Sequence, residues 1–234
     1  MASATVALHA THRVRRLRAR GAEVVPLVHH LDLPGRFPPR WLVVLGDSAA
    51  AGHGLADAEE AIARRIGRGL HGADGRATAV RSVAVDGATT AEVLDDQIEA
   101  ARDAEVVIVG VGVNDALRVI RTRSEVADTT YRLLRVLQDR AAEGASTILI
   151  TCPDLSTAPG LPPVLRPIVG RRCRTIARAQ EAVARMLGVA TLDLERDRLP
   201  PEVFGSDGFH PGEVGNARLA ARVVERLRSE DDAR

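Results

Sequence analysis

The stretch 41–48 reads WLVVLGDS, a run of apolar residues that ends in a polar turn. A short apolar run without polar alternation predicts a strand that is buried on both faces of a sheet. Comparable runs occur at 78–85, 105–112, 146–152 and 189–194. The chain from this stretch onward therefore predicts a series of buried strands.

The segments between these strands space their apolar residues as amphipathic helices do. They predict helices at 57–70, about 90–101, about 124–142, a segment ending near Leu187, and roughly 211–228. Strands that each lead into a helix specify a parallel sheet covered by helices on both faces. We therefore expect a single doubly wound α/β domain, with its site in the loops at the carboxyl ends of the strands.

Composition argues against several function classes. The chain has 234 residues, of which 45% are hydrophobic and 27% charged, as is typical of a globular protein with a sizeable core. Its 32 basic residues, all of them Arg, are balanced by 31 acidic residues, so we expect no nucleic-acid partner. Aromatic residues make up only 2%, which disfavours stacking on bases or on extended sugar chains.

Membrane and secretion signals are absent from the sequence pattern. No apolar run approaches the roughly 18 residues of a spanning helix, and residues 1–12 lack the pattern of a secretory signal. We expect a cytoplasmic protein without an integral membrane segment, and its oligomeric state stays open. Cys152 and Cys173 are badly spaced for a zinc site and are expected to be isolated thiols, with a bridge between them as the alternative.

Residues 1–40 are predicted to form a basic, Pro-containing N-terminal extension before the main domain at 41–230. Within the extension, residues 12–20 read HRVRRLRAR. This segment is interpreted as a solvated helix on the domain edge or, alternatively, as a basic arm for a membrane surface or a partner.

Two of the expected site loops carry residue types suited to nucleophilic catalysis. Ser48 follows the first strand, where its hydroxyl projects into the crevice near the start of a helix, although Ser is also an ordinary N-cap. Asp207 and His210 precede the last helix at a spacing that allows the carboxylate to orient the imidazole, or else they merely start that helix together with Pro211. Parallel strands end at one edge of the sheet, so we expect the two loops to meet.

Two further loops offer hydrogen-bond donors for a developing oxyanion. Asn114 follows the most apolar strand and can direct its side-chain amide at such an oxygen, and Gly87 can present a backbone N–H without a side chain in the way. Simple turn chemistry also suits both residue types.

Taken together, these blocks resemble the SGNH/GDSL hydrolase family of GDSL-type esterases and lipases. The resemblance covers the chain from about Trp41 to Leu227 and is carried by four ordered blocks, namely Gly46-Asp47-Ser48 with Gly52, Gly87, Gly112-Val113-Asn114-Asp115, and Asp207-Gly208-Phe209-His210-Pro211. It implies a three-layer α/β/α, flavodoxin-like fold with about five parallel strands, and a catalytic domain at 41–230.

The resemblance also implies roles for single residues. Ser48 would be the nucleophile, His210 the general base and Asp207 its orienting partner. The oxyanion hole would consist of the backbone N–H groups of Ser48 and Gly87 and the side chain of Asn114.

This chain departs from the family pattern at two places. Residues 49–51 are all Ala, where family members often carry a bulkier apolar residue and a hydroxyl residue. Ser82 stands five residues before Gly87, where an Asn is common. Neither departure removes a catalytic group, so both bear on the fine geometry of the site.

Other binding motifs are not supported. Gly110-Val111-Gly112 starts like a dinucleotide fingerprint, but Asp115 stands where its final Gly belongs, and a chain without Lys has no Walker motif. His29-His30, His53 and His71 have no carboxylate or Cys partner at metal-ligand spacing, so we expect neither a metal nor a cofactor. His53, close to Ser48, is expected to line the site.

The function expected is hydrolysis of a small or medium acyl ester, or a thioester, through an acyl-Ser48 intermediate. The alternatives are an acyltransferase on the same scaffold and a catalytically idle ligand-binding protein. The loop 153–170, with Leu161, Val164 and Leu165, is expected to wall the acyl side or, alternatively, to act as a Pro-stiffened crossover.

Overall fold

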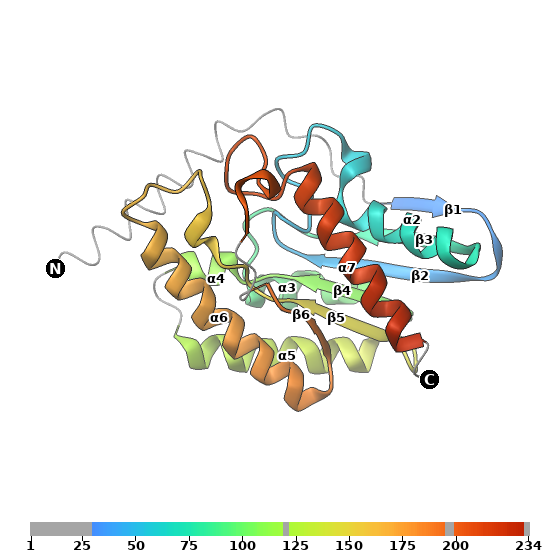
Figure 1. Cartoon of the computed structure of the whole chain (residues 1–234). Coiled ribbons are helices and arrows are strands. Elements are labelled where there is room, and N and C mark those ends of the chain that lie inside the picture. Colours follow the sequence, from blue (N-terminus) through green and yellow to red (C-terminus); the bar gives the residue numbers. More distant parts are fainter. Residues whose placement is uncertain (1–29, 119–121, 195–198, 232–234) are drawn as a thin grey trace.

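The computed structural model describes residues 30–118, 122–194 and 199–231. These residues form one six-stranded sheet with the strand order β1-β3-β2-β4-β5-β6 (Figure 1). The strands are β1 (His30–Leu33), β2 (Arg36–Gly46), β3 (Arg76–Ser82), β4 (Val106–Gly110), β5 (Ser146–Ile150) and β6 (Ala190–Leu192). Only β1 runs antiparallel to its neighbour, and all other pairs are parallel.

The order of the parallel strands confirms the predicted fold class. Numbered from β2 onward, the parallel strands have the order 2-1-3-4-5, which is typical of flavodoxin-like sheets. The order reverses between β2 and β4, whose last residues, Gly46 and Gly110, are paired in register. The crevice of a doubly wound sheet opens at such a reversal, so the loops after β2 and β4 are placed to form a site.

The sheet begins at His30 rather than at Trp41, the start of the first predicted strand. Residues 30–40, assigned to the extension by the sequence interpretation, contribute β1 and the first part of β2. The apolar pattern does not predict these strand residues, because β1 has only four residues and the start of β2 is exposed. Neither segment carries a buried apolar run. The predicted basic helix or arm at 12–20 lies outside the described residues.

Helices follow the strands nearly where helical spacing predicted them. They are α2 (Ile62–Asp74), α3 (Thr90–Asp96), α4 (Val113–Leu117), α5 (Arg123–Arg140), α6 (Arg166–Leu187) and α7 (Glu213–Asp231), with short 3-10 turns η1 (Ala58–Glu60), η2 (Ile98–Ala101), η3 (Leu155–Thr157) and η4 (Pro201–Val203). The five-residue α4 was not predicted, because one helical turn is too short to show a period. No helix in these described ranges is long and apolar enough to cross a membrane.

The helices cover both faces of the sheet, as strands without alternation require (Figure 1). Leu42 and Val44 of β2 pack in a core with residues of α2 and α7. Val43 and Leu45, which point to the other face, pack with residues of α3, α5 and α6. All four β2 side chains are at most 1% exposed, so the strand that leads to Ser48 is held from both sides.

Two buried glutamines fasten the strand ends that carry the site loops. Gln97, only 3% exposed, accepts a hydrogen bond from the N–H of Gly46 at 2.8 Å and donates one to its carbonyl at 3.0 Å. Gln180, fully buried, donates to the carbonyl of Val111 at 2.8 Å and accepts from the N–H of Cys152 at 2.9 Å. Because unpaired buried amides are costly, these pairings hold the ends of β2, β4 and β5 in fixed positions.

Candidate active site

Ser48 lies in a tight turn directly after β2. Gly46 adopts φ 145°, and a Cβ there would come within 2.1 Å of the carbonyl oxygen of Gly110, so only glycine fits. The Asp47 carboxylate accepts a hydrogen bond from the N–H of Ala49 at 3.1 Å. Residues 48–54 form consecutive turns rather than a helix, so the predicted helix start beside Ser48 is wrong.

The structure brings Ser48 together with Asp207 and His210. The Ser48 Oγ lies 3.0 Å from the His210 Nε2, although the two residues are 162 positions apart in the chain. The His210 Nδ1 lies 2.5 Å from the Asp207 Oδ2, and the imidazole and carboxylate are 3% and 7% exposed. The three side chains thus form one continuous chain of hydrogen bonds, shielded from water.

Backbone groups hold the Asp207 carboxylate in its ionised form. Its Oδ1 accepts hydrogen bonds from the N–H groups of Phe209 at 2.8 Å and His210 at 3.0 Å. Burial raises the pKa of Asp207, but the hydrogen bond and charge of His210 together with these N–H groups outweigh burial and lower its pKa to about 2. An ionised Asp207 accepts the Nδ1 proton of neutral His210, which leaves the lone pair of Nε2 facing Ser48.

The loop that follows β5 supports the loop of Asp207. The N–H of Gly160 donates to the carbonyl of Gly208 at 2.8 Å, and a Cβ on Gly160 would lie 2.3 Å from the carbonyl oxygen of Asp207. Leu161, expected in the acyl-side wall, is only 1% exposed and packs in a core with Phe209. Val164 is 77% exposed and Leu165 is partly exposed, so both of these expected wall residues reach the surface.

The side chain of Asn114, one of the expected oxyanion donors, contacts the neighbours of the other two, Asp47 beside Ser48 and Ala88 beside Gly87. Asn114, in α4, is 5% exposed and donates from its Nδ2 to the carbonyl of Ala88 at 3.0 Å, with the Asp47 Oδ2 at 3.5 Å. Gly87 adopts φ 81°, in the left-handed region that favours glycine. Among the backbone–backbone hydrogen bonds of the described ranges, none is donated by the N–H of Ser48 or of Gly87.

Asp115 supports the segment of Asn114, a role that the sequence interpretation did not assign to it. Its Oδ2 accepts hydrogen bonds from the N–H and the hydroxyl of Thr90, both at 2.9 Å, and it is 1% exposed. Together with the Asn114 amide on Ala88, this pairing ties α4 to the loop that contains Gly87. The available signal was a carboxylate beside Asn114 in an otherwise apolar region.

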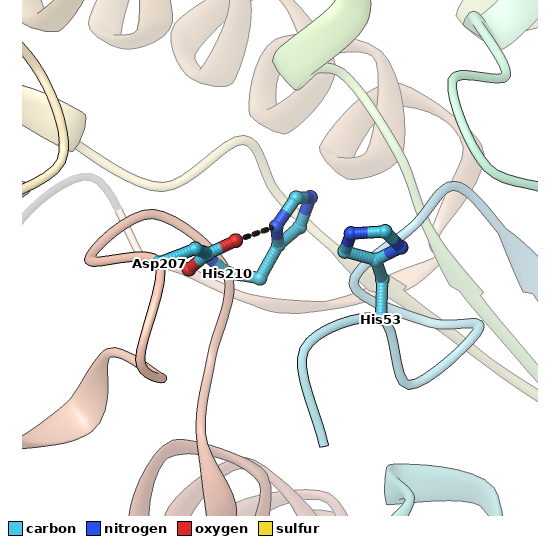
Figure 2. Close-up of side chains that lie close together, drawn as sticks. All are labelled: His53, Asp207 and His210. Atoms are coloured by element: carbon cyan, nitrogen blue, oxygen red, sulfur yellow. Dashed lines mark hydrogen bonds and ion pairs between the residues drawn. The ribbon is translucent and has the colours of Figure 1, made fainter. Parts of the chain in front are cut away.

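His53 lines the site, as expected, but it does have a carboxylate partner. Its Nδ1 lies 2.7 Å from the Asp86 Oδ2. Its ring centroid lies 4.4 Å from that of His210 at an interplanar angle of 53°, and Figure 2 shows the two rings beside each other. The expectation that the histidines have no partner at metal-ligand spacing is therefore wrong in space for His53, which also lies near Asp207 and His210. His30 pairs with Asp32, whose Oδ2 lies 2.8 Å from its Nε2, and belongs to no such group among the described residues. The spacing argument failed because Asp86 is 33 residues away.

The two cysteines are free and buried. Burial, with the neighbouring thiol of Cys173, raises the pKa of the Cys152 thiol well above its ordinary value, so Cys152 stays protonated and unreactive. A Cβ on Gly112 would lie 3.0 Å from the Cβ of Cys152. Cys152 thus packs behind the turn that leads to Asn114.

The chain is similar to known proteins over most of its length. It is 29% identical over 196 residues to a GDSL-like esterase of Mycobacterium tuberculosis, and this match covers 80% of the chain and 61% of that relative. The fold is similar to that of a lipase/acylhydrolase from Enterococcus faecalis, with a TM-score of 0.65, 22% identity, and coverage of 82% of this chain and 96% of the other.

A second solved structure has the same fold. It is the psychrotrophic esterase EstA from Pseudoalteromonas, with a TM-score of 0.63 and 16% identity, and the match covers 82% of this chain and 99% of that esterase. The model of the GDSL-like lipase/acylhydrolase family matches residues 44–218, which include all three hydrogen-bonded residues, Ser48, His210 and Asp207. This protein therefore belongs to the GDSL-like lipase/acylhydrolase family.

Proposed function

We propose that this protein hydrolyses carboxylic esters or thioesters with small or medium acyl groups, through an acyl intermediate on Ser48. The observation that carries the proposal is the chain of contacts from the Ser48 Oγ to the His210 Nε2 at 3.0 Å and from the His210 Nδ1 to Asp207 at 2.5 Å. This arrangement supplies a nucleophile, a base and an orienting carboxylate in hydrogen-bond order. Family membership supports ester chemistry, and the low aromatic content supports small acyl groups over polysaccharides.

Acylation begins when the Ser48 Oγ attacks the carbonyl carbon of the ester. His210 accepts the hydroxyl proton at Nε2, and the ionised Asp207 stabilises the imidazolium that forms. The backbone N–H groups of Ser48 and Gly87, with the amide of Asn114, donate to the oxygen on which negative charge develops. As the tetrahedral intermediate collapses, the bond to the leaving alcohol or thiol breaks and His210 returns the proton to it.

Deacylation repeats these steps with water as the nucleophile. His210 accepts a proton from water, the hydroxide attacks the acyl carbonyl, and the Ser48 Oγ leaves with the proton returned by His210. The products are a carboxylic acid and the free enzyme. An alcohol in place of water at this step would give the acyltransferase reaction.

A fluorophosphonate probe tests the nucleophile directly. The Pseudoalteromonas esterase of similar fold is described as inhibited by monoethylphosphonate, which supports the use of a phosphorus electrophile here. We expect the full chain to be labelled once, and Ser48→Ala to abolish labelling. Ser229→Ala is the matched control, because Ser229 is an exposed serine whose hydroxyl bonds only to a backbone carbonyl in the described region.

A panel of p-nitrophenyl esters from acetyl to palmitoyl then tests the acyl preference, with added alcohols to detect acyl transfer. The proposal predicts the highest kcat/KM for the shorter acyl groups and free acid as the main product. Absence of probe labelling in a folded chain would support the idle ligand-binding alternative. The cytoplasmic location remains a prediction from the sequence.

A further inference from the structure

His53 packs beside the two residues that serve Ser48. One ligand atom each from His53, Asp207 and His210 lie within 4.8 Å of one another, and Figure 2 shows the two imidazole rings next to each other. Two imidazole nitrogens and one carboxylate oxygen are a donor set that zinc and related first-row metal ions accept. Among the described residues, this is the one group of three His, Cys, Asp or Glu side chains with that spacing.

Asp86 orients His53 for coordination. The carboxylate of Asp86 lies 2.7 Å from the His53 Nδ1, so neutral His53 carries its proton on Nδ1 and its lone pair on Nε2. A carboxylate behind a histidine fixes the ring and increases its basicity, as in the outer shell of metal sites. The His53 side chain is 10% exposed and Asp86 is 44% exposed, so this pair lies between the buried triad and solvent.

We propose that His53, Asp207 and His210 form a binding site for a first-row transition-metal ion such as Zn²⁺, and that metal binding there reversibly inhibits the hydrolase. The metal site itself is independent of the proposed function. The inhibition rests on that function, because it assumes that His210 is the base.

Inhibition follows from the use of both nitrogens of His210. Nε2 faces the Ser48 hydroxyl at 3.0 Å, and Nδ1 faces Asp207 at 2.5 Å. A metal ion on Nε2 occupies the lone pair that accepts the serine proton. A metal ion on Nδ1 confines the proton of neutral imidazole to Nε2, which then donates instead of accepting.

Coordination also distorts the triad. Metal–ligand bonds of about 2.0–2.2 Å place the ligand atoms of a tetrahedral zinc ion about 3.4 Å apart. The three proposed ligand atoms already lie within 4.8 Å of one another, so modest side-chain rotations bring them to this spacing. A metal bond to either nitrogen of His210 takes the place of the hydrogen bond that this nitrogen makes with Ser48 or with Asp207.

Calorimetry on the Ser48→Ala variant of the untagged full chain tests metal binding without turnover. This variant keeps all three proposed ligands. We expect it to bind one Zn²⁺, and we expect His53→Gln in the same background to weaken the affinity at least tenfold. His30→Gln is the matched control, because His30 also pairs with a carboxylate, Asp32 at 2.8 Å, but is exposed on the edge strand. No binding, or equal loss in both variants, overturns the site.

The second readout is zinc inhibition of ester hydrolysis, normalised to the activity of each variant without metal. We expect wild type to be inhibited by Zn²⁺ and restored by a chelator, and His53→Gln to need at least tenfold more Zn²⁺. Asp86→Asn keeps every proposed ligand and should raise the Zn²⁺ concentration needed for inhibition by about 10- to 100-fold. If His53→Gln does not fold, Asp86→Asn tests the site in its place. Unchanged inhibition in the folded variants contradicts the proposal.

The two readouts separate the two proposals. If the wild type hydrolyses no ester but Ser48→Ala binds zinc through His53, the metal site stands and the esterase function fails. If esters are hydrolysed but zinc neither binds nor inhibits, the function stands and the metal site fails.

Discussion

Two histidine–carboxylate pairs lie side by side in this protein and differ in almost everything except their chemistry. The His210–Asp207 pair is 3% and 7% exposed, whereas His53–Asp86 is 10% and 44% exposed. Two backbone N–H groups fix the Asp207 carboxylate, and the second nitrogen of His210 meets a serine hydroxyl. The comparison teaches that a carboxylate can orient an imidazole without making it catalytic. The group that the second ring nitrogen faces, here the hydroxyl of Ser48, determines whether the imidazole can act as a base.

Breaking the buried pair at the imidazole should have the largest effect. His210→Gln removes the base, so we expect kcat to fall by about 10⁶-fold, as for bases of serine hydrolases that act as one unit with the nucleophile. The fall in kcat for His53→Gln should be at least about 100-fold smaller than the fall for His210→Gln. Steady-state kinetics on a p-nitrophenyl ester measure both, and similar losses would contradict the assignment of His210 as the base.

Replacing the carboxylates sharpens the comparison. Asp207→Asn keeps the shape but favours the wrong tautomer of His210, so we expect kcat to fall by about 10⁴-fold. Asp86→Asn should cost far less, because Asp86 orients a ring that does not face the serine. Steady-state measurement of kcat for both variants tests this, and their melting temperatures are the control for folding.

The oxyanion donor should have an intermediate effect. Asn114→Ala removes a donor that acts mainly when charge develops on the carbonyl oxygen, so we expect kcat to fall by about 10²- to 10³-fold with little change in KM. Its Nδ2 also donates to the carbonyl of Ala88 at 3.0 Å, so some loss of stability accompanies the change. A large fall in melting temperature with kcat nearly intact would leave Asn114 a structural residue.

The smallest expected effect is on stability against acid. The pKa of Asp207 is lowered from 3.8 to about 2, so the folded state binds its proton less readily than the unfolded chain. The stability from this group is therefore present above about pH 4 and is lost as the pH falls toward 2. Urea unfolding between pH 5 and pH 2.5 should show a shallower decline for Asp207→Asn than for wild type, and equal slopes would contradict the lowered pKa.

Much of the fold was predictable because it depends on local patterns. The apolar runs at 41–48 and 105–112 are buried on both faces, and burial on both faces requires an uninterrupted apolar sequence. The edge strand β1 was not predictable, because four half-exposed residues carry no such pattern. The meeting of Ser48 with His210 was predictable from parallel topology, although the turns after Ser48 were not.

The hydrogen-bond partners of buried polar groups could not be predicted from the sequence. Asp115 with Thr90, Gln97 with Gly46 and His53 with Asp86 are joined across 25, 51 and 33 residues, and no spacing rule connects such positions. Each pair exists because a buried donor or acceptor must find a partner among the groups that the fold places nearby.

The sequence by itself determined the alternation of strands and helices, the edge of the sheet at which the site lies, and the residue types that can act there. Periodicity and the parallel connection suffice for these features, because both are properties of consecutive residues. Only the tertiary structure decided which imidazole meets the serine and which meets Asp86. Such pairings depend on distances of a few ångströms between distant segments, and close packing alone sets those distances.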